Sequence, residues 1–206
     1  MTPFFLQNSR LLKVELSGQS LLARAGSMVA YDGQIKFEKA ILGGEGVFGA
    51  LKRKATGEGI ALMTTSGKGT VYFAQNAAEI LILPLQNEKI WVESSVLLAL
   101  DSGLKTNTVF AGLRGASSGQ GLFTTTVEGN GSVAILSHGT PLELEVGPSF
   151  PLYVDPDAFL GFSGQLTQEF IFDVNWKTFI GQGSGESFQL KFSGQGRVFI
   201  QPNERK

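Results

Sequence analysis

Apolar and polar residues alternate along much of this chain, with the two-residue period of β-strands. In Leu12-Lys13-Val14-Glu15-Leu16 and in Leu142-Glu143-Leu144-Glu145-Val146, every second residue is aliphatic. Side chains two residues apart lie on the same face of a strand, so this pattern predicts strands with one buried face and one solvated face. No stretch of a dozen residues shows a clean apolar face at the i, i+3, i+4 spacing of a helix. The pattern therefore predicts an all-β fold.

Three Gly-x-Gly motifs interrupt these runs. Each follows an apolar-rich approach and precedes a polar residue and a strand that begins with valine. Tight hairpin turns need positive φ angles, which glycine adopts without a clash at Cβ. We therefore expect each motif to close a hairpin, which gives six structural turn glycines: Gly67, Gly69, Gly129, Gly131, Gly194 and Gly196.

A second correspondence indicates an internal repeat. Two segments recur at an offset of 69 residues, and the third copy offers shorter equivalents: Leu12–Leu16 with Leu81–Leu85 and Leu142–Val146, and Met28–Asp32 with Leu97–Asp101 and Leu152–Asp155. We take the units as roughly 1–75, 76–138 and 139–206, within a single domain of residues 1–206. A lone unit would leave sheet edges and half a core uncovered. We therefore expect three tandem β-hairpin repeats that close around a common axis with pseudo-threefold symmetry.

Composition narrows the classes of function. The 206 residues include 27 glycines and no cysteine, which excludes disulfides, thiolate metal sites and cysteine nucleophiles. The net charge of −1 lacks the basic excess of a general nucleic-acid binder. No apolar run approaches the roughly 18 residues of a spanning helix, and Met1–Leu6 does not resemble a signal peptide. We expect a cytoplasmic protein without a transmembrane segment, for which peripheral membrane contact stays open.

Two motifs match enzyme signatures but lack their context. Gly44–Gly49 reads G-x-G-x-x-G, but Gly57 stops any following helix and no acidic residue stands where the ribose ligand of a dinucleotide-binding fold belongs. Gly115–Gly119 reads G-x-S-x-G around Ser117, with Glu128 and His138 downstream, but a strand follows where a hydrolase needs a helix. We interpret both as glycine-rich or serine-rich loops and assign no catalytic or cofactor-binding residue.

Three further features of the sequence are candidate binding sites. His138 is the only histidine and precedes a Gly-Thr-Pro segment, which favours a turn residue over a metal ligand. Asp32, Asp101 and Asp155 recur in the three units; they would bind a cation if they ringed a threefold axis, but turn aspartates are the favoured interpretation. Lys52-Arg53-Lys54 is the only dense basic run and is a candidate interaction loop for phosphate, acidic lipid or an acidic partner.

The chain also resembles a known family, the altered-inheritance-of-mitochondria protein 24 family, over nearly its whole length. Four segments carry the resemblance, in this order: Leu6–Val14, Ala25–Tyr31, Gly43–Phe48 and Thr56–Gly59. The resemblance implies a fold like that of the tryptophan RNA-binding attenuation protein, of the double-stranded β-helix type and triplicated in one chain. It also implies no established enzymatic activity, and mitochondrial members are tied to inner-membrane organisation. RNA binding does not follow from the fold, because function depends on particular sites.

These observations favour a non-enzymatic scaffold or protein-interaction module, without cofactor or metal, that self-associates through sheet surfaces or edges or binds another protein. Two alternatives stay open. The 16 phenylalanines and two tryptophans are compatible with a module for a small apolar or lipid-like ligand. Nucleic-acid binding is suggested only by the analogy of fold.

Overall fold

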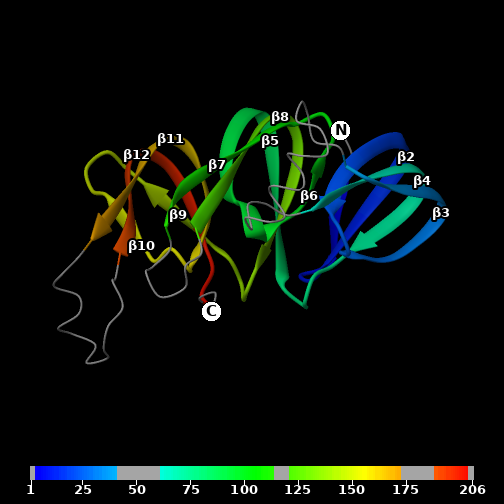
Figure 1. Ribbon diagram of the computed structural model, residues 1–206, viewed down its shortest axis with the longest axis horizontal. Coiled ribbons are helices and arrows are strands. Elements are labelled where there is room, and N and C mark those ends of the chain that lie inside the picture. Colours follow the sequence, from blue (N-terminus) through cyan, green and yellow to red (C-terminus); the bar gives the residue numbers. More distant parts are fainter. Residues whose placement is uncertain (1–2, 41–60, 114–120, 173–187, 204–206) are drawn as a thin grey trace.

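The structure is a computed structural model that describes residues 3–40, 61–113, 121–172 and 188–203 (Figure 1). The chain is all-β, as the alternating pattern predicted. The elements are β1 (Phe4–Asn8), β2 (Leu11–Arg24), β3 (Met28–Lys39), β4 (Leu62–Phe73), β5 (Glu79–Glu93), the 3₁₀ turn η1 (Ser94–Val96), β6 (Leu97–Asp101), β7 (Lys105–Leu113), β8 (Gly121–Ser137), β9 (Leu142–Val146), β10 (Leu152–Val154), β11 (Phe159–Phe172) and β12 (Phe188–Ile200). In the described part of the chain, no helix has the length and hydropathy needed to cross a membrane.

The strands form one twelve-stranded antiparallel sheet, ordered β10-β12-β11-β5-β8-β6-β2-β4-β3, with β1, β7 and β9 paired beside this path. The order groups the strands by unit. Strands β2 to β4 come from the first unit, β5 to β8 from the second, and β9 to β12 from the third. Figure 1 shows these three groups side by side along the long axis of the molecule. Within each group the last strand in sequence lies between the others, because β4, β8 and β12 each pair on both sides.

Matching registers relate the three groups. Val71, Val133 and Val198 on the central strands lie opposite Tyr31, Leu100 and Phe162. In all three pairs a bulge precedes this position, where the register shifts between Met28 and Ala30, between Leu97 and Ala99, and between Phe159 and Gly161. The path of the sheet is nevertheless open. No ladder joins the first unit to the third in the described residues, so the expected closure around a common axis is not seen there, and pseudo-threefold symmetry stays a prediction.

The prediction that the six motif glycines form hairpin turns is wrong. Each lies inside a continuous strand: Gly67 and Gly69 in β4, Gly129 and Gly131 in β8, Gly194 and Gly196 in β12. Four of them do have positive φ, between 121° and 148°, whereas Gly131 and Gly196 lie outside that range. The physical reason is a close approach of paired neighbouring strands, since Gly69 lies opposite Gly33 and Gly196 lies opposite Gly164. A Cβ on Gly69 would lie 2.1 Å from the carbonyl oxygen of Asp32, and one on Gly196 would lie 2.2 Å from that of Ser163.

Two hydrophobic clusters lie beneath the sheet. The larger one belongs mainly to the first and second units, with Leu12, Phe73, Leu100 and Ile135 fully buried, and also includes Leu160 and Phe199 of the third. The smaller one belongs mainly to the third unit and is rich in phenylalanine, with Phe159, Phe162, Phe192 and the neighbouring Leu122. The phenylalanines of the two clusters are therefore core, whereas Phe5, Tyr31, Phe150 and Tyr153 are exposed.

Candidate interaction surface

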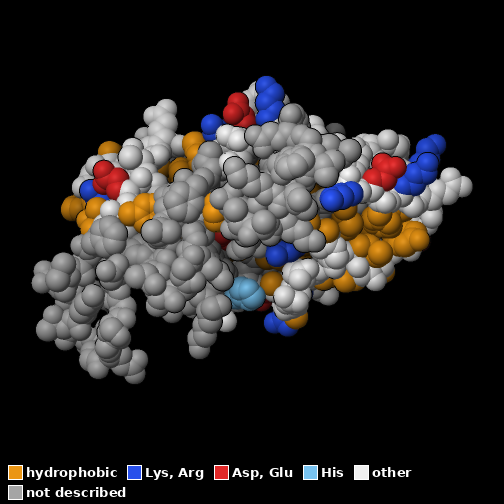
Figure 2. All heavy atoms as spheres, viewed as in Figure 1, with side chains coloured by type: hydrophobic (Ala, Val, Ile, Leu, Met, Phe, Trp, Pro, Cys, Tyr) orange, Lys and Arg blue, Asp and Glu red, His pale blue; other side chains and the backbone are white. Residues whose placement is uncertain are grey.

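Large apolar side chains are exposed on β1, at Phe5 and Leu6, and at the two ends of the sheet. On β3, Val29 and Tyr31 are 56% and 50% exposed; we call these residues and Phe37 the β3 end. At the opposite end, Tyr153 on β10 is 51% exposed, Phe150 just before β10 is 83% exposed, and Leu142 on β9 is 50% exposed. We call β10 together with these residues the β10 end. Figure 2 shows hydrophobic side chains over both of these regions of the molecule. Exposed apolar groups of this size at defined edges are typical of surfaces that contact other proteins.

The residues of the β3 end lie along a long strand edge. All of β3 pairs with β4, but no described strand pairs with its outer side, since β3 ends the path of the sheet. Tyr31 contacts Phe37 edge to face, with ring centroids 5.3 Å apart. An unpaired edge offers a row of backbone N–H and C=O groups to an added strand. The β3 end therefore combines backbone hydrogen-bonding groups with aromatic side chains.

The β10 end is shorter. Among the described strands, the three residues of β10 pair only with β12, where Leu152, Tyr153 and Val154 lie opposite Phe192, Lys191 and Leu190. Val154 is buried in the core of the third unit, while Tyr153 projects outward and half of its surface is accessible. This end presents an aromatic side chain on a strand that is anchored from one side only.

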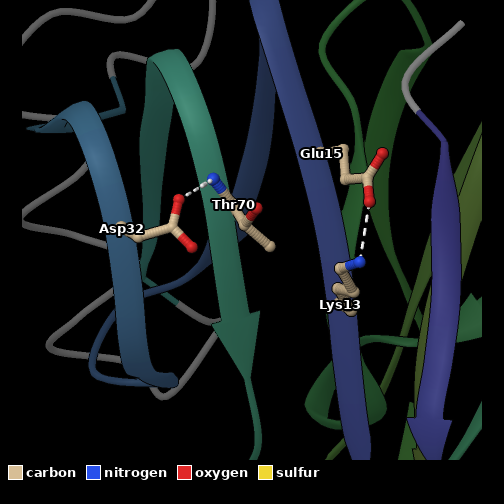
Figure 3. Close-up of polar contacts among 4 residues, drawn as sticks. All are labelled: Lys13, Glu15, Asp32 and Thr70. Atoms are coloured by element: carbon tan, nitrogen blue, oxygen red, sulfur yellow. Dashed lines mark hydrogen bonds and ion pairs between the residues drawn. The ribbon is translucent and has the colours of Figure 1, made fainter.

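Polar contacts fix the backbone behind the β3 end. Oδ1 of Asp32 accepts the backbone N–H of Thr70 at 3.1 Å, which ties β3 to β4 beside Gly69 (Figure 3). On neighbouring β2, Nζ of Lys13 lies 2.7 Å from Oε1 of Glu15 (Figure 3). The hydrogen bond with Glu15, and then its negative charge, raise the pKa of Lys13 above the ordinary lysine value. The bond from Thr70 ties β3 to β4, whereas the Lys13–Glu15 pair lies within β2, on the far side of β4.

The recurring aspartates do not meet as a ring. Asp32 and Asp101 play the same part, since Oδ2 of Asp101 accepts the backbone N–H of Ser132 at 2.8 Å. Asp155 does not belong with them. It follows β10, where Oδ1 accepts the N–H of Asp157 in a local turn, and the residue in register with Asp32 is Ser163. The described residues contain no group of three or more His, Asp or Glu side chains that would hold a metal ion.

The other candidates from the sequence fall elsewhere. His138 follows β8 in an exposed bend, where its backbone N–H donates to Oε1 of Gln201, as expected of a turn residue. Three of the segments singled out above lie outside the described residues: Gly44–Gly49, Lys52–Lys54 and Gly115–Gly119 with Ser117. The structure therefore neither brings them together nor separates them.

Sequence reasoning missed the residues that now stand out, Val29, Tyr31 and Tyr153. A signal was present at the offset of 69 residues, which aligns Val29 and Tyr31 with Leu98 and Leu100. All four are apolar, so the alignment indicates a shared environment. It does not say that Leu98 and Leu100 are covered by a neighbouring unit while Val29 and Tyr31 have none.

Comparisons with known proteins agree with this architecture. The model of a family described as mitochondrial biogenesis AIM24 matches residues 4–203. The crystal structure of protein SPYM3_0169 from Streptococcus pyogenes superposes with a TM-score of 0.75 at 22% sequence identity, over 99% of this chain and 94% of that one. At that identity the likeness concerns the fold alone. No curated protein matches the chain.

Proposed function

Since the chain belongs to the mitochondrial biogenesis AIM24 family, we propose that it works as a non-enzymatic interaction module whose exposed sheet ends bind protein. The proposal leaves out catalysis for two reasons. The family resemblance implies no established enzymatic activity, and the sequence that follows each of the two enzyme-like motifs does not predict the helix that the motif's chemistry needs.

The observation that carries the proposal is the β3 end. A strand of twelve residues ends the sheet with an unpaired outer edge in the described structure, and Tyr31 and Val29 stand exposed along it. Natural sheets usually protect such edges with charge, proline, bulges or a covering element. β3 carries a bulge between Met28 and Ala30 and exposed charged residues such as Lys36 and Glu38. Its accessible aromatic and β-branched side chains nevertheless suit strand addition, in which backbone hydrogen bonds supply affinity and side chains supply specificity.

The test is affinity purification of the full chain from its native cells, with chemical cross-linking before lysis and identification by mass spectrometry. The Tyr31→Lys variant places a charge at the centre of the β3 end. The matched control, Gln34→Lys, places the same charge at an exposed position of the same strand. We expect proteins cross-linked to the wild type and the control, other copies of the chain included, to be depleted about tenfold or more with Tyr31→Lys.

Purified components then confirm any such contact in a titration. Equal recovery with all three chains, or no protein cross-linked to any of them, would refute the proposal. Recovery of a bound lipid or nucleic acid whose amount follows the Tyr31 substitution would instead favour one of the two alternative functions.

A further inference from the structure

Two internal junctions show how one unit joins the next. At the first, Leu21, Leu22 and Ala23 of β2 pair with Asp101, Leu100 and Ala99 of β6. The junction is antiparallel and uses only these three residue pairs. It joins the first long strand of one unit to the second strand of the following unit.

The second junction repeats the first. Ile90, Trp91 and Val92 of β5 pair with Ser163, Phe162 and Gly161 of β11. The registers coincide, because Leu100 and Phe162 lie opposite equivalent valines of the central strands, Val133 and Val198. The two junctions are therefore the same contact, made twice.

The two halves of a third such junction lie at opposite ends of the sheet. Leu21, Ile90 and Leu152 lie opposite Thr65, Val127 and Phe192, the equivalent positions of the three central strands. Leu152-Tyr153-Val154 of β10 is thus the counterpart of Ile90-Trp91-Val92. By the register of β3 with β4, Ala30-Tyr31-Asp32 is likewise the counterpart of Gly161-Phe162-Ser163. These segments are the last and first strands of the sheet path, and Figure 1 shows them at opposite ends of the molecule.

The side chains of the two free halves match those of the junctions already made. Phe162 is 4% exposed and stacks on Trp91, with ring centroids 4.7 Å apart and 5° between the rings. Their counterparts, Tyr31 and Tyr153, are also aromatic, and each is half exposed. Val29 is exposed where its counterparts Leu98 and Leu160 are fully buried. Val29, Tyr31 and Tyr153 are thus side chains that an additional neighbouring unit would cover.

We propose that the β10 end of one copy of this chain pairs with the β3 end of a second copy, and that this head-to-tail contact reproduces the internal junctions. Tyr153 then lies opposite Tyr31, with Leu152 opposite Asp32 and Val154 opposite Ala30. This inference rests on the proposed interaction function and names the partner as a second copy. Because the two surfaces differ, each copy keeps one free half of each kind, and assembly continues until a ring closes or a filament grows.

The test uses the absence of cysteine from the sequence. Two single variants, Tyr31→Cys and Tyr153→Cys, are purified separately, mixed at micromolar concentration and oxidised gently. Directly opposed residues of antiparallel strands have the Cα separation that a disulfide needs. The control is the double variant Leu22→Cys/Leu100→Cys, whose residues lie opposite each other within one chain in the same register. We expect the mixture to yield the covalent heterodimer in large excess over either homodimer, and the control to close within the chain.

Sedimentation of the wild type supplies the second readout. We expect species larger than a monomer, with the dissociation constant weakened about tenfold or more by Tyr31→Lys and left unchanged by Gln34→Lys. A Tyr31→Cys homodimer as the main product would mean a symmetric contact and would overturn the head-to-tail register. A monomer at every concentration, without cross-linking in the mixture, would overturn self-association altogether. In that last case the proposed function still holds if a different protein is retained through Tyr31, and falls if none is.

Discussion

Trp91 and Phe162 stack face to face across the junction between the second and third units, with 4.7 Å between ring centroids and 5° between ring planes. Phe162 also contacts Phe159 and Phe192 of its own unit. The pair therefore connects the aromatic core of the third unit to the strand that carries Trp91.

Replacing Phe162 with alanine should destabilise the protein by about 3–5 kcal/mol, because it removes a buried ring and leaves a cavity among aromatic neighbours. Urea unfolding followed by circular dichroism measures the loss. The control is Phe150→Ala, at a position 83% exposed, which should change the free energy of unfolding by no more than about 0.5 kcal/mol. Similar losses in the two variants would contradict the assigned packing.

Asp101→Ala should cost more stability than Asp32→Ala, although both carboxylates accept a backbone N–H from the central strand. Asp101 and Ser132 are buried, so the abandoned N–H finds no water, and a loss of about 1–3 kcal/mol is expected. Asp32 is exposed, and water replaces its carboxylate at a cost of about 1 kcal/mol or less. Asp101→Asn keeps an acceptor oxygen and should recover part of the loss. Equal unfolding free energies for the two alanine variants would argue against this difference in burial.

Gly69→Ala and Gly196→Ala should each destabilise the fold by about 1–3 kcal/mol. The added methyl group of either variant meets a backbone oxygen of the paired neighbouring strand, and Gly69 also has a φ of 148°. Gly103→Ala is the matched control, because nothing lies within 4 Å of its Cβ position. Thermal unfolding of the three variants checks the prediction. Losses near zero at Gly69 and Gly196 would show that the paired strands do not approach each other so closely.

The ion pair of Lys13 and Glu15 should give a small stabilisation that disappears at high pH. The pKa of Lys13 is raised in the folded protein, so its contribution is fully present below the ordinary lysine value and is lost as pH rises through the raised one. The difference in unfolding free energy between wild type and Lys13→Met, measured at neutral pH and at alkaline pH, checks the sign. Added salt should shrink the difference at neutral pH, because the pair is accessible to solvent. A difference that is independent of both would assign it to packing of the lysine stem.

The strands could be predicted from the sequence because their signal is local. Alternation along Leu12–Leu16 directly reports a strand with one buried face, and these residues lie in β2 with Leu12, Val14 and Leu16 buried. The offset of 69 residues was equally informative, since Asp32 and Asp101 make the same hydrogen bond.

The glycine motifs misled because two structures share one pattern. A Gly-x-Gly between alternating runs suits a hairpin, but it also suits a long strand at a point where the neighbouring strand's backbone approaches closely. Only the pairing of Gly69 with both Gly33 and Leu16 distinguishes the two, and that contact is not local. Asp155 was placed wrongly for a similar reason. Its unit divides the first long strand into β9 and β10, which shifts the register seen in the sequence.

The candidate interaction surface was beyond the reach of the sequence. Tyr31, Leu100 and Phe162 are all large and apolar, and nothing in their own neighbourhoods marks Tyr31 as the one left accessible. Its exposure depends on its position at the end of a row, which is a property of the whole molecule.

The two internal junctions bear on how such a chain can grow. Each links its neighbours by three residue pairs at equivalent positions, so the contact does not depend on how many units precede it. A unit added by gene duplication would find an uncovered half of the same junction to pair with. Loss of a unit would uncover that half again. The geometry of this junction therefore sets no limit of its own on the number of units that can follow one another.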